Sequence, residues 1–162
     1  MLHYVSGDIL LSSASLLAHG VAPNDHFSSG LALALRERWP AMVKDFRHWC
    51  HQHSPRPGDV WIWSGPGIRV AHLLTQDEAK DAHSHPGRAR SDHVNHALRN
   101  LARAIEQERV ASLALPRIGT GVGGLDWEVV KPLFAHHLGG LKIPVYVYES
   151  YRRGERAAEP PR

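Results

Sequence analysis

The stretch that decides the fold reads LALPRIGTGVGGLDW and runs from Leu113 to Trp127. A short apolar run ends at Pro116, four glycines follow between positions 119 and 124, and a helical pattern begins at Asp126. Glycine has no Cβ, so a glycine-rich loop can turn its N–H groups toward a ligand, and a following helix N-terminus adds a favourable field for an anion. The segment therefore predicts a strand, a phosphate-binding loop and a helix in succession.

Apolar runs with strand character alternate with helical patterns along the rest of the chain. The expected strands are 2–5, 15–19, 59–64, 68–75, 110–115 and 143–148, and the expected helices are 28–36, 40–53, 92–108 and 126–138. The segment 76–92 is polar and without period, which predicts a long surface loop. This order predicts an α/β fold whose largely parallel central sheet is covered by helices on both faces.

The composition indicates one soluble globular domain. The chain has 162 residues, of which 43% are hydrophobic, and this is enough to build a single core. Cys50 is the one cysteine, which excludes an intramolecular disulfide and indicates a reducing compartment. No apolar run approaches the ~20 residues that a membrane helix needs. We therefore expect a cytoplasmic protein that does not associate with membranes.

The charge is mildly basic. A net charge of +3 suits an anionic ligand, and part of the excess lies near the C-terminus. We expect residues 1–150 to form the domain and residues 151–162, a basic segment rich in Pro and Ala without apolar period, to form a solvated tail.

Histidines and Cys50 gather in the run HWCHQH from His48 to His53. Structural zinc sites usually combine ligand doublets from separated parts of the chain, and this run does not supply such a pattern. The sequence therefore predicts no metal site. Cys50 is interpreted as a small buried hydrophobic residue.

Two familiar phosphate loops fit the glycines poorly. A Walker-type loop needs Lys followed by Ser or Thr after its last glycine, where this chain has Leu125 and Asp126. A dinucleotide fingerprint is formally matched by Gly119, Gly121 and Gly124. However, the chain that follows has room for only one helix and one strand, whereas that motif normally opens a series of βαβ units. An NAD-dependent oxidoreductase is therefore a distant alternative.

Three segments together suggest another ligand. They are YVSGDIL (4–10), LAHGVAPNDHFSSGLALAL (17–35) and LALPRIGTGVGGLDW (113–127). In order and spacing they resemble the ligand-binding signatures of the macrodomain family, most of all the subgroup of terminal ADP-ribose protein glycohydrolase and bacterial DNA ADP-ribosyl glycohydrolases. The resemblance covers most of the chain. It implies a three-layer α/β/α fold with a mixed sheet, ADP-ribose as the ligand, mono-ADP-ribosylated proteins or nucleic-acid-linked ADP-ribose as partners, and no cofactor.

The resemblance also implies which residues contact the ligand. Asp8 would accept from the adenine amine, and turn formation is the alternative role for its carboxylate. Tyr148 would stack on adenine or serve as a core aromatic residue. The helix start at Ser29 and the glycine loop would bind the two phosphates and the distal ribose. The implied ligand-binding set is Asp8, Ile9, Asn24, Ser29, Gly30, Leu31, Pro116, Arg117, Ile118, Gly119, Thr120, Gly121, Val122, Gly123, Gly124, Leu125 and Tyr148.

Two positions argue against a simple transfer of the subgroup's mechanism. Where its glycohydrolases have a lysine and its protein-deADP-ribosylating member has an aspartate, this chain has Gln76 and Gly123. A water molecule held between a ligand phosphate and the loop backbone could still carry out hydrolysis. Gln76 would orient this water, and Asp77, Glu78 and His83 are the candidates for a catalytic acid or base. We expect hydrolysis of mono-ADP-ribose esters on acidic protein side chains, and a non-catalytic reader of ADP-ribosylation is the alternative.

Overall fold

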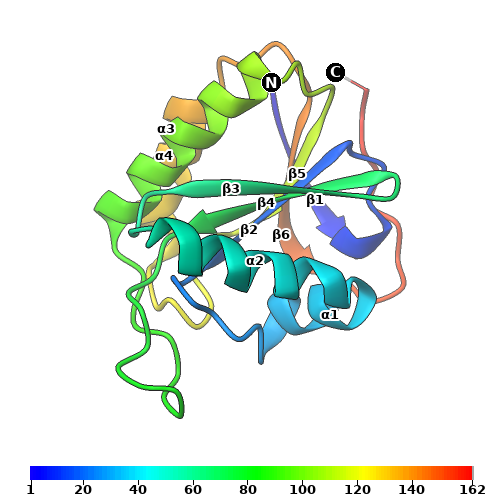
Figure 1. The fold of residues 1–162 in the computed structure, drawn as a ribbon. Helices are drawn as coiled ribbons and strands as arrows, with labels where there is room; N and C mark the ends of the chain where they lie inside the picture. Colours follow the sequence, from blue (N-terminus) through cyan, green and yellow to red (C-terminus); the bar gives the residue numbers. More distant parts are fainter. Residues whose placement is uncertain (162) are drawn as a thin grey trace.

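The computed structural model describes residues 1–161, and its strands form one mixed sheet flanked by α-helices (Figure 1). The strands are β1 (Leu2–Gly7), β2 (Leu16–Val21), β3 (Val60–Gly65), β4 (Ile68–Leu74), β5 (Leu113–Pro116) and β6 (Val145–Tyr151). The helices are α1 (Gly30–Arg38), α2 (Pro40–His53), α3 (Ser91–Gln107) and α4 (Trp127–Leu138), with a 3₁₀ helix η1 (Ile9–Leu11) after β1. Every predicted element is present, with ends that differ by a few residues.

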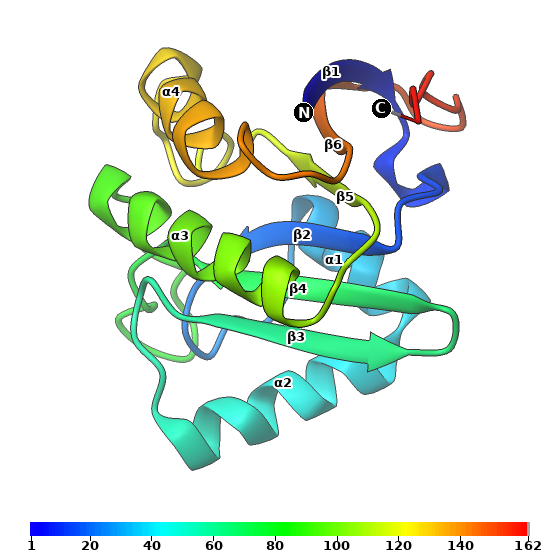
Figure 2. The same ribbon diagram turned by 90° about the horizontal axis from the view of Figure 1, so that it is seen from above.

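The sheet has the order β1-β6-β5-β2-β4-β3, which can be followed from edge to edge in Figure 2. All neighbouring strands are parallel except β3 and β4, which form an antiparallel hairpin. A hairpin needs only a tight turn, whereas the parallel neighbours need crossover connections. Gly67 supplies that turn with φ +72°. The predicted mixed, largely parallel sheet is therefore confirmed.

Helices cover both faces of the sheet and create a separate apolar core on each. Helix α3 buries one stripe at helical spacing, formed by Val94, Ala97, Leu98, Leu101 and Ile105. Helix α2 buries Met42, Val43, Phe46 and Cys50 on the opposite face. Cys50 is 3% exposed, so its predicted role as a buried hydrophobic residue is confirmed. The result is a three-layer α/β/α domain.

The segment after β6 differs from the solvated tail that the sequence predicts. Most of its side chains are exposed, but its backbone returns along β1 and η1 (Figures 1 and 2). Arg152 N donates to the carbonyl of Gly7 at 3.0 Å, and Glu155 O accepts from Asp8 N at 2.7 Å. We name residues 152–161 the C-terminal strap. Composition could not show these contacts because they join the two ends of the chain.

The polar segment between β4 and α3 is the long loop that the sequence predicts. Its base is closed by a bridge between Gln76 and Ala89, and Arg90 pairs with Asp77 at 3.0 Å. The remainder projects from the body of the molecule (Figure 1). Within residues 1–161, none of the helices has the length and apolar character that a bilayer crossing requires.

Candidate functional site

A cleft of about 670 Å³ opens where β2, β5 and β6 end. Its walls are the start of α1, the glycine loop after β5 and part of the β4–α3 loop. An apolar pocket of about 390 Å³ adjoins it and shares Leu31, Pro116 and Tyr148 with it. Ligands of open α/β sheets generally bind at the carboxyl ends of the strands, and these volumes are in the range of small-molecule sites.

The glycine loop presents bare backbone to this cleft. Gly119 and Gly124 have φ of +83° and +78°, which lets the loop turn sharply and return Leu125 N to the Gly119 carbonyl at 2.9 Å. Within the described residues, the N–H groups of Gly121, Val122 and Gly123 donate to no protein acceptor. Consecutive unpaired N–H groups of this kind suit the oxygens of a phosphate.

The start of α1 lines the same cleft. Ser29 occupies the N-cap position without a side-chain capping bond, and Gly30 has φ +59° with open space where a Cβ would stand. The first N–H groups of a helix have no partner within the helix and favour an anion. The cleft therefore offers two N–H-bearing walls, which together suit a diphosphate.

The loop before α1 is fixed by a buried carboxylate. Asp25 accepts from Ala22 N at 3.0 Å and from Phe27 N at 2.8 Å, and it is 9% exposed. These bonds hold Phe27 in the left-handed region with φ +56°. The Asp25 carboxylate therefore fixes the turn that leads into α1.

We expect Asp25→Ala to lower the free energy of unfolding by about 2–4 kcal/mol, because two buried N–H groups would lose their acceptor. Chemical denaturation measures the change. Asp126→Ala is the matched control, since Asp126 also precedes a helix but makes no side-chain capping bond. Equal effects of the two substitutions would contradict the role given to Asp25.

Most of the predicted ligand-binding residues lie together. The cleft or its adjoining pocket is lined by Ile9, Ser29, Gly30, Leu31, Pro116, Arg117, Ile118, Gly119, Thr120, Gly121, Val122, Gly123 and Tyr148. Gly124 and Leu125 close the glycine loop behind this surface. Asn24 lies in a separate hollow, where its amide donates to Glu78.

Asp8 has the turn-forming role that the sequence offers as its alternative. Its Oδ1 accepts from Leu10 N and its Oδ2 from Gly154 N, each at 3.0 Å, and it is 6% exposed. Asp8 lines neither the cleft nor the apolar pocket, although its neighbour Ile9 lines the apolar pocket. Acceptance from adenine stays a prediction for this carboxylate.

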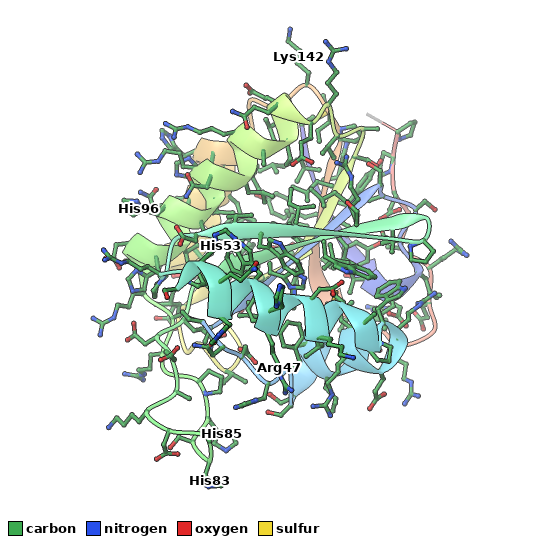
Figure 3. All side chains as sticks on the ribbon, in the orientation of Figure 1. Arg47, His53, His83, His85, His96 and Lys142 are labelled. Atoms are coloured by element: carbon green, nitrogen blue, oxygen red, sulfur yellow. The ribbon has the colours of Figure 1, made fainter. Side chains whose placement is uncertain are left out.

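The four catalytic candidates do not converge. Gln76 lines the cleft and is 8% exposed, and its Nε2 donates to the Gly87 carbonyl at 3.1 Å. Asp77 pairs with Arg90, and Glu78 is bonded to Asn24. His83 lies at the outer end of the projecting loop (Figure 3). A catalytic role for Asp77, Glu78 or His83 would require this loop to move.

Residues 20–134 match the family model described as Macro domain. The chain belongs to the Macro domain family. A DNA ADP-ribosyl glycohydrolase of Thermus aquaticus is 27% identical over 150 residues, which are 92% of this chain and 41% of that protein. The human ADP-ribose glycohydrolase OARD1 is 22% identical over 148 residues, covering 90% of this chain and 89% of that protein. The chain thus spans less than half the length of the first of these relatives.

Solved macrodomains have the same fold. The macrodomain of Thermus aquaticus DarG has a TM-score of 0.80 at 27% identity and covers 92% of this chain and 98% of its own. A macrodomain protein from Streptomyces coelicolor has a TM-score of 0.71 at 30% identity, with coverage of 92% and 99%. A structure of Thermosipho africanus DarTG in complex with ADP-ribose has a TM-score of 0.81 at 23% identity and covers 96% of this chain and 42% of that one.

The cleft of this macrodomain also contains a residue that sequence reasoning missed. His19 lines its floor, and its Nε2 lies 2.7 Å from Nδ1 of His72, its partner in the register of β2 and β4. Burial lowers the pKa of His19 from 6.5 to about 3. Burial and the neighbouring His19 hold the pKa of His72 well below its ordinary value. Both imidazoles are therefore neutral near pH 7.

The side chains that could bind a metal ion are scattered over the described part of the macrodomain. Among residues 1–161, no three His, Cys, Asp or Glu side chains lie close enough to share one. His48 and His51 belong to α2 and lie on the exposed side of that helix, whereas Cys50 is buried. The HWCHQH run thus spreads its side chains around a helix.

Proposed function

We propose that this macrodomain binds ADP-ribose in the cleft and hydrolyses its ester linkage to acidic protein side chains. The observation that carries the proposal is the pair of N–H-bearing walls, from the glycine loop and from the start of α1, that line one cleft. The diphosphate would lie between them. Adenine would enter the apolar pocket beside Ile9, Leu31 and Tyr148. The distal ribose would then point toward Gln76.

A water molecule serves as the nucleophile in this proposal. Its oxygen forms a bond to the anomeric carbon of the distal ribose, the bond from that carbon to the ester oxygen breaks, and the side-chain carboxylate leaves with the electron pair. The proton of the water passes to a phosphate oxygen of the ligand and then to solvent. Because Gln76 Nε2 is already bonded to the Gly87 carbonyl, Oε1 is the atom that would accept from this water. A carboxylate leaves without a strong acid, so the absence of a lysine at this position matters least for an ester.

A linkage to DNA is a second candidate, because the Thermus aquaticus relative is named as a DNA ADP-ribosyl glycohydrolase. Arg117 at the cleft and the net charge of +3 suit a nucleic acid as well as a free phosphate. A nitrogen or hydroxyl group of DNA would be a poorer leaving group than a carboxylate, so cleavage from DNA would place a greater demand on acid catalysis.

We expect release of labelled ADP-ribose from glutamate-linked substrate at catalytic protein concentration, and no release from serine-linked substrate. A chelator should leave the rate unchanged, because the proposed reaction uses no metal. An ADP-ribosylated oligonucleotide serves as the third substrate, and its faster cleavage would replace the ester with DNA as the preferred linkage. Tight binding of ADP-ribose without release from any of the three substrates would indicate a non-catalytic reader of ADP-ribosylation.

A further inference from the structure

The C-terminal strap is held to the end of β1, to η1 and its C-cap Ser12, and to β6. Glu159 links the segment after η1 to β6: its Oε2 accepts from the hydroxyl groups of Ser12 and Tyr148 at 2.6 Å each, and its Oε1 accepts from Ser13 N at 2.9 Å. Nearer the start of the strap, Gly154 N donates to the Asp8 carboxylate. Glu159 thus accepts three hydrogen bonds, although most residues of the strap are exposed.

The residues that the strap holds are those that shape the apolar pocket. Tyr148 lines this pocket, and Asp8 caps the 3₁₀ helix that carries Ile9 and Leu10 into it. Burial, together with the hydrogen bond to Glu159, raises the pKa of the Tyr148 hydroxyl. The phenol therefore stays protonated and continues to donate to Glu159 throughout the physiological range.

The strap also lies directly behind the pocket wall. Gly7 lines the pocket, and a Cβ built on Gly7 would stand only 2.7 Å from the backbone nitrogen of Ala157. The backbone of Gly7 thus lies between the strap and the pocket. Neither the pocket nor the cleft is lined by residues of the strap, so the strap supports this site without blocking it.

We propose that the C-terminal strap pre-forms the pocket that receives adenine, and that Glu159 is the positioning residue that fixes Tyr148 and η1 for this purpose. The inference rests on the proposed binding of ADP-ribose. Glu159 touches no ligand in this arrangement. Its carboxylate restrains the orientation of the Tyr148 ring, and the base then binds a surface that needs no reordering.

Glu159→Ala is the test, with Glu155→Ala as the matched control. The Glu155 side chain belongs to the same strap but, among residues 1–161, pairs only with Arg152, at 3.9 Å and exposed to solvent. Calorimetry with ADP-ribose should show weakening of about tenfold for Glu159→Ala, the scale of one well-placed hydrogen bond, and none for Glu155→Ala. Glu159→Gln keeps an acceptor for Tyr148 and should recover most of the affinity. Tyr148→Phe should weaken binding by a similar factor. The double variant Glu159→Ala/Tyr148→Phe should bind no more weakly than either single variant.

Steady-state kinetics distinguish positioning of the pocket from a general loss of stability. With glutamate-linked substrate, Glu159→Ala should raise KM and leave kcat unchanged, because the reacting bond lies at the other end of the ligand. Unchanged affinity in Glu159→Ala, with wild-type protein that binds ADP-ribose, would overturn the strap inference alone. Equal losses of affinity and melting temperature in Glu155→Ala and Glu159→Ala would overturn it as well. Failure of the wild-type protein to bind ADP-ribose would instead overturn the proposed function on which the inference rests.

Discussion

Gly121→Glu is expected to weaken ADP-ribose binding by more than about 100-fold, or about 3 kcal/mol, because it places a carboxylate beside the N–H groups that would hold a phosphate. The substitution should leave the domain folded. A Cβ on Gly121 would meet nothing within 4 Å, and this glycine does not need the left-handed region. Titration calorimetry measures the affinity, and circular dichroism with a melting curve checks the fold.

The choice of glycine matters for this test. A Cβ on Gly123 would stand 2.6 Å from the Gly119 carbonyl oxygen and 2.7 Å from Ala89 Cβ, so its substitution would distort the loop itself. Gly140→Glu is the matched control, since a Cβ there also meets nothing within 4 Å and the residue lies in the turn after α4. Undiminished binding in Gly121→Glu would remove the phosphate role from this loop.

Acidification is expected to lower the free energy of unfolding steeply from about pH 6.5 toward pH 3, because of the buried pair His19 and His72. Both pKa values are depressed in the folded protein, so between the folded and unfolded values the unfolded chain binds more protons. Stability from this source is fully present above pH 6.5 and is lost as the pH falls. Each histidine contributes a slope of up to about 1.4 kcal/mol per pH unit.

Urea denaturation at several pH values measures this slope, and the double variant His19→Asn/His72→Leu should flatten it relative to wild type. His83→Asn is the control, because His83 is exposed and should leave the slope unchanged. Proton NMR of the wild-type protein gives an independent reading: the ring signals of His19 and His72 should not titrate between pH 7 and pH 4. Titration of either ring near pH 6.5 would contradict the prediction.

Local sequence patterns predicted the helices, the strands and the glycine loop. The glycine loop was predictable because its strand, its turn and its helix lie within fifteen consecutive residues, from Leu113 to Trp127. The start of α1 was predictable for the same reason. Such segments carry their own conformational preferences, and these agree with the tertiary fold.

Contacts between distant segments were not predictable in this way. His19 and His72 each lie in an apolar pattern that indicates a strand, but their pairing depends on the register of β2 and β4. Glu159 is one charge in a basic, proline-containing segment, and its partner Tyr148 is reached only because the strap turns back. The polar loop shows the same limit: Asp77 and Glu78 have the chemistry of catalytic groups, but a local pattern does not show that they pair with Arg90 and Asn24 in this structure. Their catalytic role stays a prediction.

The pairing of β1 with β6 has a consequence for how the protein is made. β1 lies at the sheet edge, and Leu2 pairs with Val145, so the first strand has no strand partner until the last strand has been synthesised. At the usual rate of translation this interval is on the order of 10 s, far longer than hairpin formation. Strand β5 and the glycine loop that follows it leave the ribosome earlier, and β5 can pair with β2 beforehand. The glycine-loop end of the cleft can therefore assemble on the nascent chain, whereas the apolar pocket beside Tyr148 is completed last.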